Sequence, residues 1–94
     1  MEVVGLGRRK SKLTIERAKK IYQILSENKD GLATPTLFNI VLKEGIIKEY
    51  STLYQILKML KEKGIVEQRS EKGLAKWEVV KFVDLLTLEK IITS

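Results

Sequence analysis

The sequence predicts a single α+β domain in which three helices precede a β-hairpin and one more helix follows it. Between residues 50 and 63, apolar side chains recur at the spacing of one helix face, and a glycine ends the run. Two short segments rich in β-branched and aromatic residues, 65–69 and 74–80, then flank the glycine-containing loop 70–73, as in a hairpin. The length of 94 residues allows one modest core.

The helix predicted at residues 50–63 has two faces of opposite character. Its inner face consists of apolar residues at helical spacing, namely Leu53, Ile56, Leu57 and Leu60. Half a turn away lie polar and charged residues, namely Ser51, Gln55, Lys58 and Glu62, with Tyr54 on the flank. Ser51 is the expected N-cap, and Gly64 is the expected C-terminal stop. Hydroxyl, amide and ammonium groups on an outer face suit hydrogen bonding to base edges and phosphates.

The first helix is predicted to begin near Leu13 or Thr14, with Thr14 as its cap, and to end near Asn28. Its core stripe consists of Ala18, Ile21, Tyr22 and Leu25. This start divides the chain into a flexible basic arm at residues 1–12, a folded domain at 13–80 and a C-terminal helical segment at 81–94.

The second helix is predicted from a capping signal after a very short extended segment at residues 32–33. Thr34 is the expected N-cap and Pro35 the first helical residue, and the helix should end near Glu44, before Gly45. Its expected core residues are Leu37, Phe38, Val41 and Leu42. Trp77 in the second hairpin segment is also expected to be a core residue.

The composition argues against an enzyme. The chain has no cysteine and no histidine, which excludes disulfides, the usual zinc sites and cysteine- or histidine-based catalysis. Its twelve carboxylates are scattered among lysines, and no glycine-rich phosphate loop is found. We therefore expect no catalytic residue, no metal and no small-molecule cofactor. No apolar run reaches the roughly 20 residues of a membrane span, and a cytoplasmic location is expected.

The net charge of +6 is concentrated at one end of the chain. Between Arg8 and Lys20 there are seven basic residues and one acid, whereas charges cancel from Gly64 onward. Such a basic end favours a polyanion partner, most simply nucleic acid, although surplus lysine can also serve only solubility. Two interpretations of the arm residues Arg8, Arg9 and Lys10 follow. They contact DNA, at phosphates or in a narrow minor groove, or they belong to a solubilising tail.

The element order and the run from Ser51 to Glu67 resemble winged helix-turn-helix transcription regulators. The resemblance covers roughly residues 13–80 and is closest to the PadR-like and MarR-like groups and to small archaeal or viral regulators. It implies that the helix at residues 52–63 enters the major groove and that the hairpin is a wing touching phosphates or the minor groove. Two departures are an acidic residue, Glu71, at the wing tip and the lack of arginine in the third helix.

These patterns predict a sequence-specific regulator that binds double-stranded DNA and acts by promoter occupancy. The expected DNA contacts on the third helix are Ser51, Thr52, Tyr54, Gln55, Lys58 and Lys61. Lys58 and Lys61 are expected to touch phosphates, as are Arg69 and Lys72 of the wing. The alternative for these residues is an ordinary solvated surface. The alternative functions are a protein-interaction module and a non-specific architectural DNA-binding protein.

The last helix, predicted over residues 82–93, has a wider apolar surface than one stripe requires. We expect part of it to pack on the first helix and part to form a homodimer, which would place two third helices about one DNA turn apart. The candidate dimerisation residues are Phe82, Leu85, Leu86, Leu88, Ile91 and Ile92. The alternative is that this segment packs entirely into its own core or frays.

Overall fold

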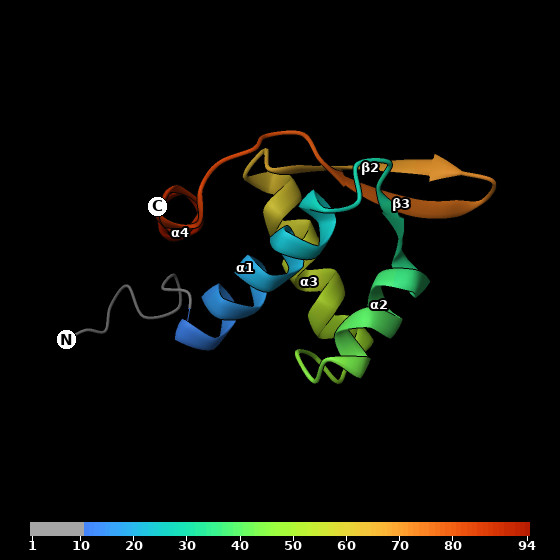
Figure 1. The fold of residues 1–94 in the computed structure, drawn as a ribbon, viewed down its shortest axis with the longest axis horizontal. Helices are drawn as coiled ribbons and strands as arrows, with labels where there is room; N and C mark the ends of the chain where they lie inside the picture. Colours follow the sequence, from blue (N-terminus) through green and yellow to red (C-terminus); the bar gives the residue numbers. More distant parts are fainter. Residues whose placement is uncertain (1–10) are drawn as a thin grey trace.

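The computed structural model describes residues 11–94, which form four helices and a three-stranded antiparallel sheet (Figure 1). The elements are α1 (Lys12–Ser26), β1 (Leu32–Ala33), α2 (Thr34–Lys43), α3 (Tyr50–Glu62), β2 (Val66–Glu71), β3 (Leu74–Val79) and α4 (Leu85–Thr93). The α+β class and the predicted order of elements are confirmed. Arg8, Arg9 and Lys10 lie outside the described residues.

The core forms where α1, α2 and α3 pack against one face of the sheet. The predicted stripe of α1 and the predicted inner face of α3 are both fully confirmed as buried. In α2, Leu37 and Val41 are buried and Phe38 packs at the edge of the core. Leu42 was expected in this core, but it is 41% exposed, because it follows Val41 by about 100° around the helix and so points outward.

Three predicted helix caps are wrong. Ser11, not Thr14, caps α1, because Ser11 Oγ accepts the Thr14 backbone N–H at 3.1 Å. The N-cap of α2 is Ala33, which makes Thr34 the first helical residue. The helix α3 begins at Tyr50, after Glu49, so that Ser51 lies inside the helix and is exposed.

The sheet has β3 in the middle, paired with β1 on one side and β2 on the other. The expected loop at 70–73 is shorter than predicted, since residues 70 and 71 extend β2 and only Lys72 and Gly73 form the turn. Both have positive φ, 54° and 82°. Two left-handed central residues match the twist of a two-residue hairpin, which explains why the strands reach this far.

Trp77 in the centre of β3 connects the sheet to α2. Its side chain is 1% exposed, and its Nε1–H donates to Thr34 Oγ1 at 2.7 Å. The Thr34 hydroxyl in turn donates to the Ala75 carbonyl at 3.2 Å, so both polar groups are satisfied inside the core. These bonds explain why Thr34 does not cap α2. Its hydroxyl is used in the core.

The helix α4 lies against α1 at the end of the molecule opposite the hairpin (Figure 1). The Tyr22 hydroxyl donates to the Val83 carbonyl and accepts the Val83 N–H, both at 2.8 Å, and so fixes the approach to α4. Asp84 caps the helix through the Thr87 N–H, and this hydrogen bond lowers the pKa of the Asp84 carboxyl. The helix therefore starts three residues later than predicted.

Two of the candidate dimerisation residues are buried inside the subunit. Leu88 and Ile92 are at most 1% exposed and belong to the same core as α1 and α3. They are corrected to core residues, since a side chain already covered by its own chain cannot also meet a second copy. Leu85 and Ile91 are half-buried. Phe82 and Leu86 are 59% and 66% exposed.

Gly31 and Gly64 offer a matched test of how tightly β1 packs on β3. Both have positive φ, 86° and 79°, but a Cβ at Gly31 would lie 2.7 Å from the Trp77 carbonyl oxygen, whereas Gly64 has open space around it. We expect Gly64→Ala to lower the free energy of unfolding by about 1–2 kcal/mol, the cost of a left-handed alanine. Gly31→Ala should cost clearly more. Urea denaturation measures both, and equal losses would contradict the close packing.

Candidate nucleic-acid interface

The predicted outer face of α3 is not covered by the rest of the described chain. The exposed members of this face are Ser51, Tyr54, Gln55, Lys58, Lys61 and Glu62, and Thr52 is half-buried. They are exposed because the opposite stripe of the same helix is anchored in the core. The structure therefore brings the six α3 residues predicted as DNA contacts onto one surface, which carries two ammonium groups and one carboxylate.

One side of this face runs into the hairpin. Tyr54 is 39% exposed, and its ring meets the ring of Trp77 edge-on, with centroids 6.0 Å apart and planes at 80°. Nearer the end of the helix, Lys61 Nζ donates to Gln68 Oε1 of β2 at 3.4 Å. These two contacts join α3 to both strands of the hairpin, β3 through Trp77 and β2 through Gln68. The helix and the hairpin thus form one continuous surface.

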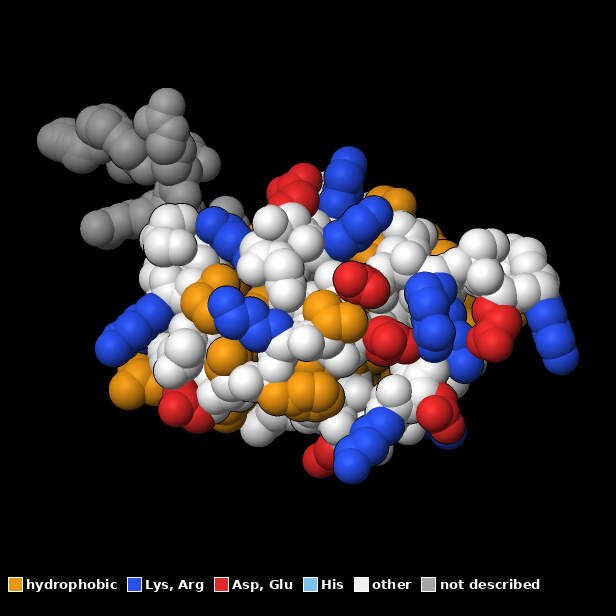
Figure 2. All heavy atoms as spheres, turned by 90° about the horizontal axis from the view of Figure 1, so that it is seen from above, with side chains coloured by type: hydrophobic (Ala, Val, Ile, Leu, Met, Phe, Trp, Pro, Cys, Tyr) orange, Lys and Arg blue, Asp and Glu red, His pale blue; other side chains and the backbone are white. Residues whose placement is uncertain are grey.

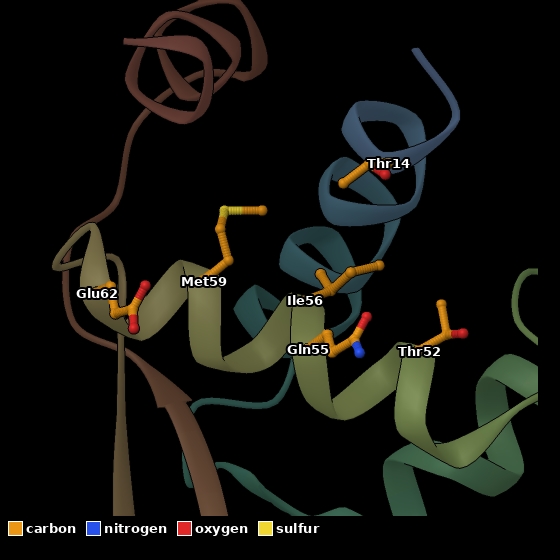
Figure 3. Close-up of a pocket in the computed structure, with 6 residues that line it drawn as sticks. All are labelled: Thr14, Thr52, Gln55, Ile56, Met59 and Glu62. Atoms are coloured by element: carbon orange, nitrogen blue, oxygen red, sulfur yellow. The ribbon is translucent and has the colours of Figure 1, made fainter. Parts of the chain in front are cut away.

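The other side of the face borders a shallow cavity of about 280 Å³ between α3 and the start of α1 (Figure 3). Its apolar floor is Ile56 and Met59, and Gln55 lies at its rim. Thr14 of α1 forms the far wall. Ser11, the first described residue, is hydrogen-bonded to Thr14.

The outer surface of the hairpin is largely neutralised by its own ion pairs. Arg69 Nη2 lies 2.6 Å from Glu78 Oε1, and Lys76 Nζ lies 2.9 Å from Glu71 Oε1. The hydrogen bond from Lys76 lowers the pKa of the Glu71 carboxyl. Of the two predicted phosphate contacts, Arg69 is therefore already paired within the sheet. Figure 2 shows the same mixture of acidic and basic side chains along the projecting hairpin.

Lys72 differs from the other cations of the hairpin. It occupies the tip, and within residues 11–94 no carboxylate lies at ion-pair distance from its ammonium group. A charge at the end of a projecting hairpin can reach a surface that α3 contacts at the same time. Among the hairpin residues predicted as contacts, Lys72 is the one whose charge is available to a partner.

Sequence reasoning missed Tyr50. With Ser51 as the expected N-cap, Tyr50 was given no role at the site, yet it is the first residue of α3 and is 49% exposed. Its ring packs edge-on against Phe38 of α2, with centroids 5.4 Å apart. The signal was present in the sequence as an aromatic hydroxyl directly before the polar start of the helix. It adds a second phenol to the outer face of α3.

Among residues 11–94 no group of three or more acidic residues is placed to hold a metal ion, and none of the helices there is long and apolar enough to cross a bilayer. No protein-family model, curated protein or solved structure matches this chain. The surface formed by α3 and the hairpin is the candidate functional site because the polar side chains of α3 are exposed beside the hairpin.

Proposed function

We propose that this protein is a winged helix-turn-helix regulator that binds double-stranded DNA with α3 in the major groove. The observation that carries the proposal is the continuous surface on which an exposed polar helix face adjoins a projecting hairpin. An α-helix fits the major groove, and a hairpin beside it meets the backbone or the minor groove. The helix α2 and the turn at residues 44–49 supply the preceding part of the helix-turn-helix unit.

On α3, the polar groups divide between base reading and backbone binding. Gln55 is exposed in the middle of the outer face, and a glutamine amide can bond to both N6 and N7 of adenine. Ser51, Thr52 and Tyr54 supply hydroxyls for base or backbone oxygen and nitrogen atoms. Lys58 and Lys61 suit phosphates, where a point charge needs no fixed geometry. Arginine is the commonest reader of guanine, and α3 has none. The site should therefore favour A·T over G·C base pairs.

The hairpin and the N-terminal segment would add backbone contacts on either side of α3. Lys72 would be the wing cation, because the ion pair with Glu78 leaves Arg69 less able to hold a phosphate. Arg8, Arg9 and Lys10, which precede Ser11 in the sequence, would be further phosphate contacts. Neutralising phosphates in this way displaces counterions, so binding should depend strongly on salt.

A homodimer would complete the regulator. The exposed Phe82 and Leu86 lie on either side of the N-cap of α4, Asp84, and α4 lies away from the hairpin (Figure 1). A twofold pairing there would present two α3 helices to one palindromic site. Bound to a promoter, the dimer would block or redirect polymerase, and no chemical step is involved.

A protein-interaction module is the second candidate. It is favoured by the balanced charges on the outer surface of the hairpin and by the exposed apolar side chains of Tyr50, Leu42 and Leu74. Binding to duplex DNA across a salt series separates the two. A DNA-binding protein loses affinity steeply as salt rises, whereas an interaction module shows negligible binding at every salt concentration. A preference for selected over random duplex separates a regulator from an architectural protein.

Lys58→Ala tests the assignment of a phosphate contact on α3. We expect affinity to fall for all duplex sequences alike, and the slope of log affinity against log salt to become shallower by about one, because one fewer counterion is released. Fluorescence anisotropy with a labelled duplex measures both quantities. The control is Lys29→Ala, in the turn between α1 and β1, which should leave the slope unchanged. An unaltered slope in Lys58→Ala would remove Lys58 from the interface.

Gln55→Ala tests base reading. A bidentate amide contact discriminates by about 1–3 kcal/mol, so its loss should relax the preference for adenine at one position of a duplex selected from a random pool. Repeating the selection with the variant measures this. Gln23→Ala, at an exposed position of α1, is the matched control and should select the same site as the native protein. If the base preference of Gln55→Ala is also unchanged, α3 is not the reader.

Leu86→Asp tests the dimer. Placing a charge on the exposed side of α4 should produce monomers, since an unpaired carboxylate is costly to bury at an apolar interface. Sedimentation equilibrium gives the mass directly. Leu74→Asp makes the same substitution at a leucine of the hairpin that is 50% exposed, and it should leave the native oligomeric state. Dimers in both variants would exclude α4 as the interface.

A further inference from the structure

The only tryptophan of the chain lies where α2, α3 and the hairpin meet. The backbone of Trp77 is paired with Leu32 of β1 and with Gln68 of β2. Its Nε1–H is bonded to Thr34 at the start of α2, and its ring contacts Tyr54 of α3. Through its backbone and its side chain, Trp77 therefore connects β1, β2, α2 and α3.

The indole of Trp77 is held in one orientation. Its Nε1–H bond to Thr34 Oγ1 is short, 2.7 Å, and Thr34 is itself only 3% exposed and fixed by its bond to the Ala75 carbonyl. Close packing of Gly31 over the Trp77 carbonyl oxygen fixes the backbone on the other side. Rotation of the indole would break a buried hydrogen bond, which makes the orientation stable.

Tyr54 lies between this fixed ring and solvent. The ring contacts Trp77 edge-on, an arrangement that stabilises aromatic pairs, while 39% of the residue remains exposed among the polar residues of α3. An exposed tyrosine without such a neighbour samples several rotamers. Ordering it on DNA would then cost conformational entropy, which reduces affinity and blurs selectivity.

We infer that Trp77 is a positioning residue that holds the phenol of Tyr54 in one orientation for contact with DNA. It makes α3 and the hairpin one rigid reading surface, because the same indole is part of β3 and packs on α3. Trp77 does not touch DNA, and it acts only through Tyr54. The DNA contact rests on the proposed function, whereas the fixed orientation of the ring is a property of the free protein.

The orientation of Tyr54 can be measured without DNA. In the free protein, three-bond Hα–Hβ couplings should show a single χ1 rotamer for Tyr54. In Trp77→Phe, which has a smaller ring and no Nε1–H, and in Thr34→Val, which removes the bond that orients the indole, these couplings should become averaged. Tyr50, which packs on Phe38 instead, is the internal control and should not change.

The thermal midpoint of each variant shows whether it is folded. If Trp77→Phe does not fold, Thr34→Val still decides the question, since it keeps the indole and changes only its anchor. Averaged Hα–Hβ couplings for Tyr54 in the native protein would overturn the inference. The inference would also be overturned if Tyr54 kept a single rotamer in either variant, Trp77→Phe or Thr34→Val, while that variant was folded.

A double-mutant cycle then tests the role in recognition. Tyr54→Ala and Trp77→Phe should each weaken binding to the selected duplex about fivefold, the scale of one edge-on aromatic contact, with the salt slope unchanged. The double variant should be little weaker than either, whereas independent effects would multiply to about 25-fold and overturn the inference. If the native protein binds no duplex, the proposed function fails, and the couplings alone decide whether Trp77 positions Tyr54.

Discussion

A sheet of three short strands has little apolar surface to offer a core, and the indole of Trp77 is the largest side chain that it buries. Burying an indole also buries its N–H, which is costly unless an acceptor is provided. Thr34 provides that acceptor at the start of α2, and its own hydroxyl proton goes to the Ala75 carbonyl. This hydrogen bond connects the start of α2 to the middle strand of the sheet inside the core.

The helices themselves were predictable, because their signal is local. The core stripes of α1 and α3 follow from the three- and four-residue spacing of apolar side chains, and both were predicted residue by residue. The outer face of α3 follows from the same spacing by exclusion. Whether this face binds DNA stays a prediction.

Features that depend on distant residues could not be read from the sequence. Thr34 looks like a cap in its local context, but its partner Trp77 is 43 residues away, and nothing near Thr34 indicates that bond. The pairing of Arg69 with Glu78 depends on the register of β2 against β3, and that register depends on the conformation of a two-residue turn. Leu88 and Ile92 are buried in the core. The sequence alone could not distinguish them from the exposed apolar residues of the same segment, because the difference depends on how α4 packs.

The turn at the tip of the hairpin has its own consequence for how stability and charge are balanced. Lys72 holds a left-handed backbone that asparagine or glycine adopts more readily, and the difference is on the order of 1 kcal/mol. An asparagine at this position would make the hairpin turn more stable but would remove the ammonium group from the tip. The chain thus has a less favourable turn and a positive charge at the tip of the hairpin.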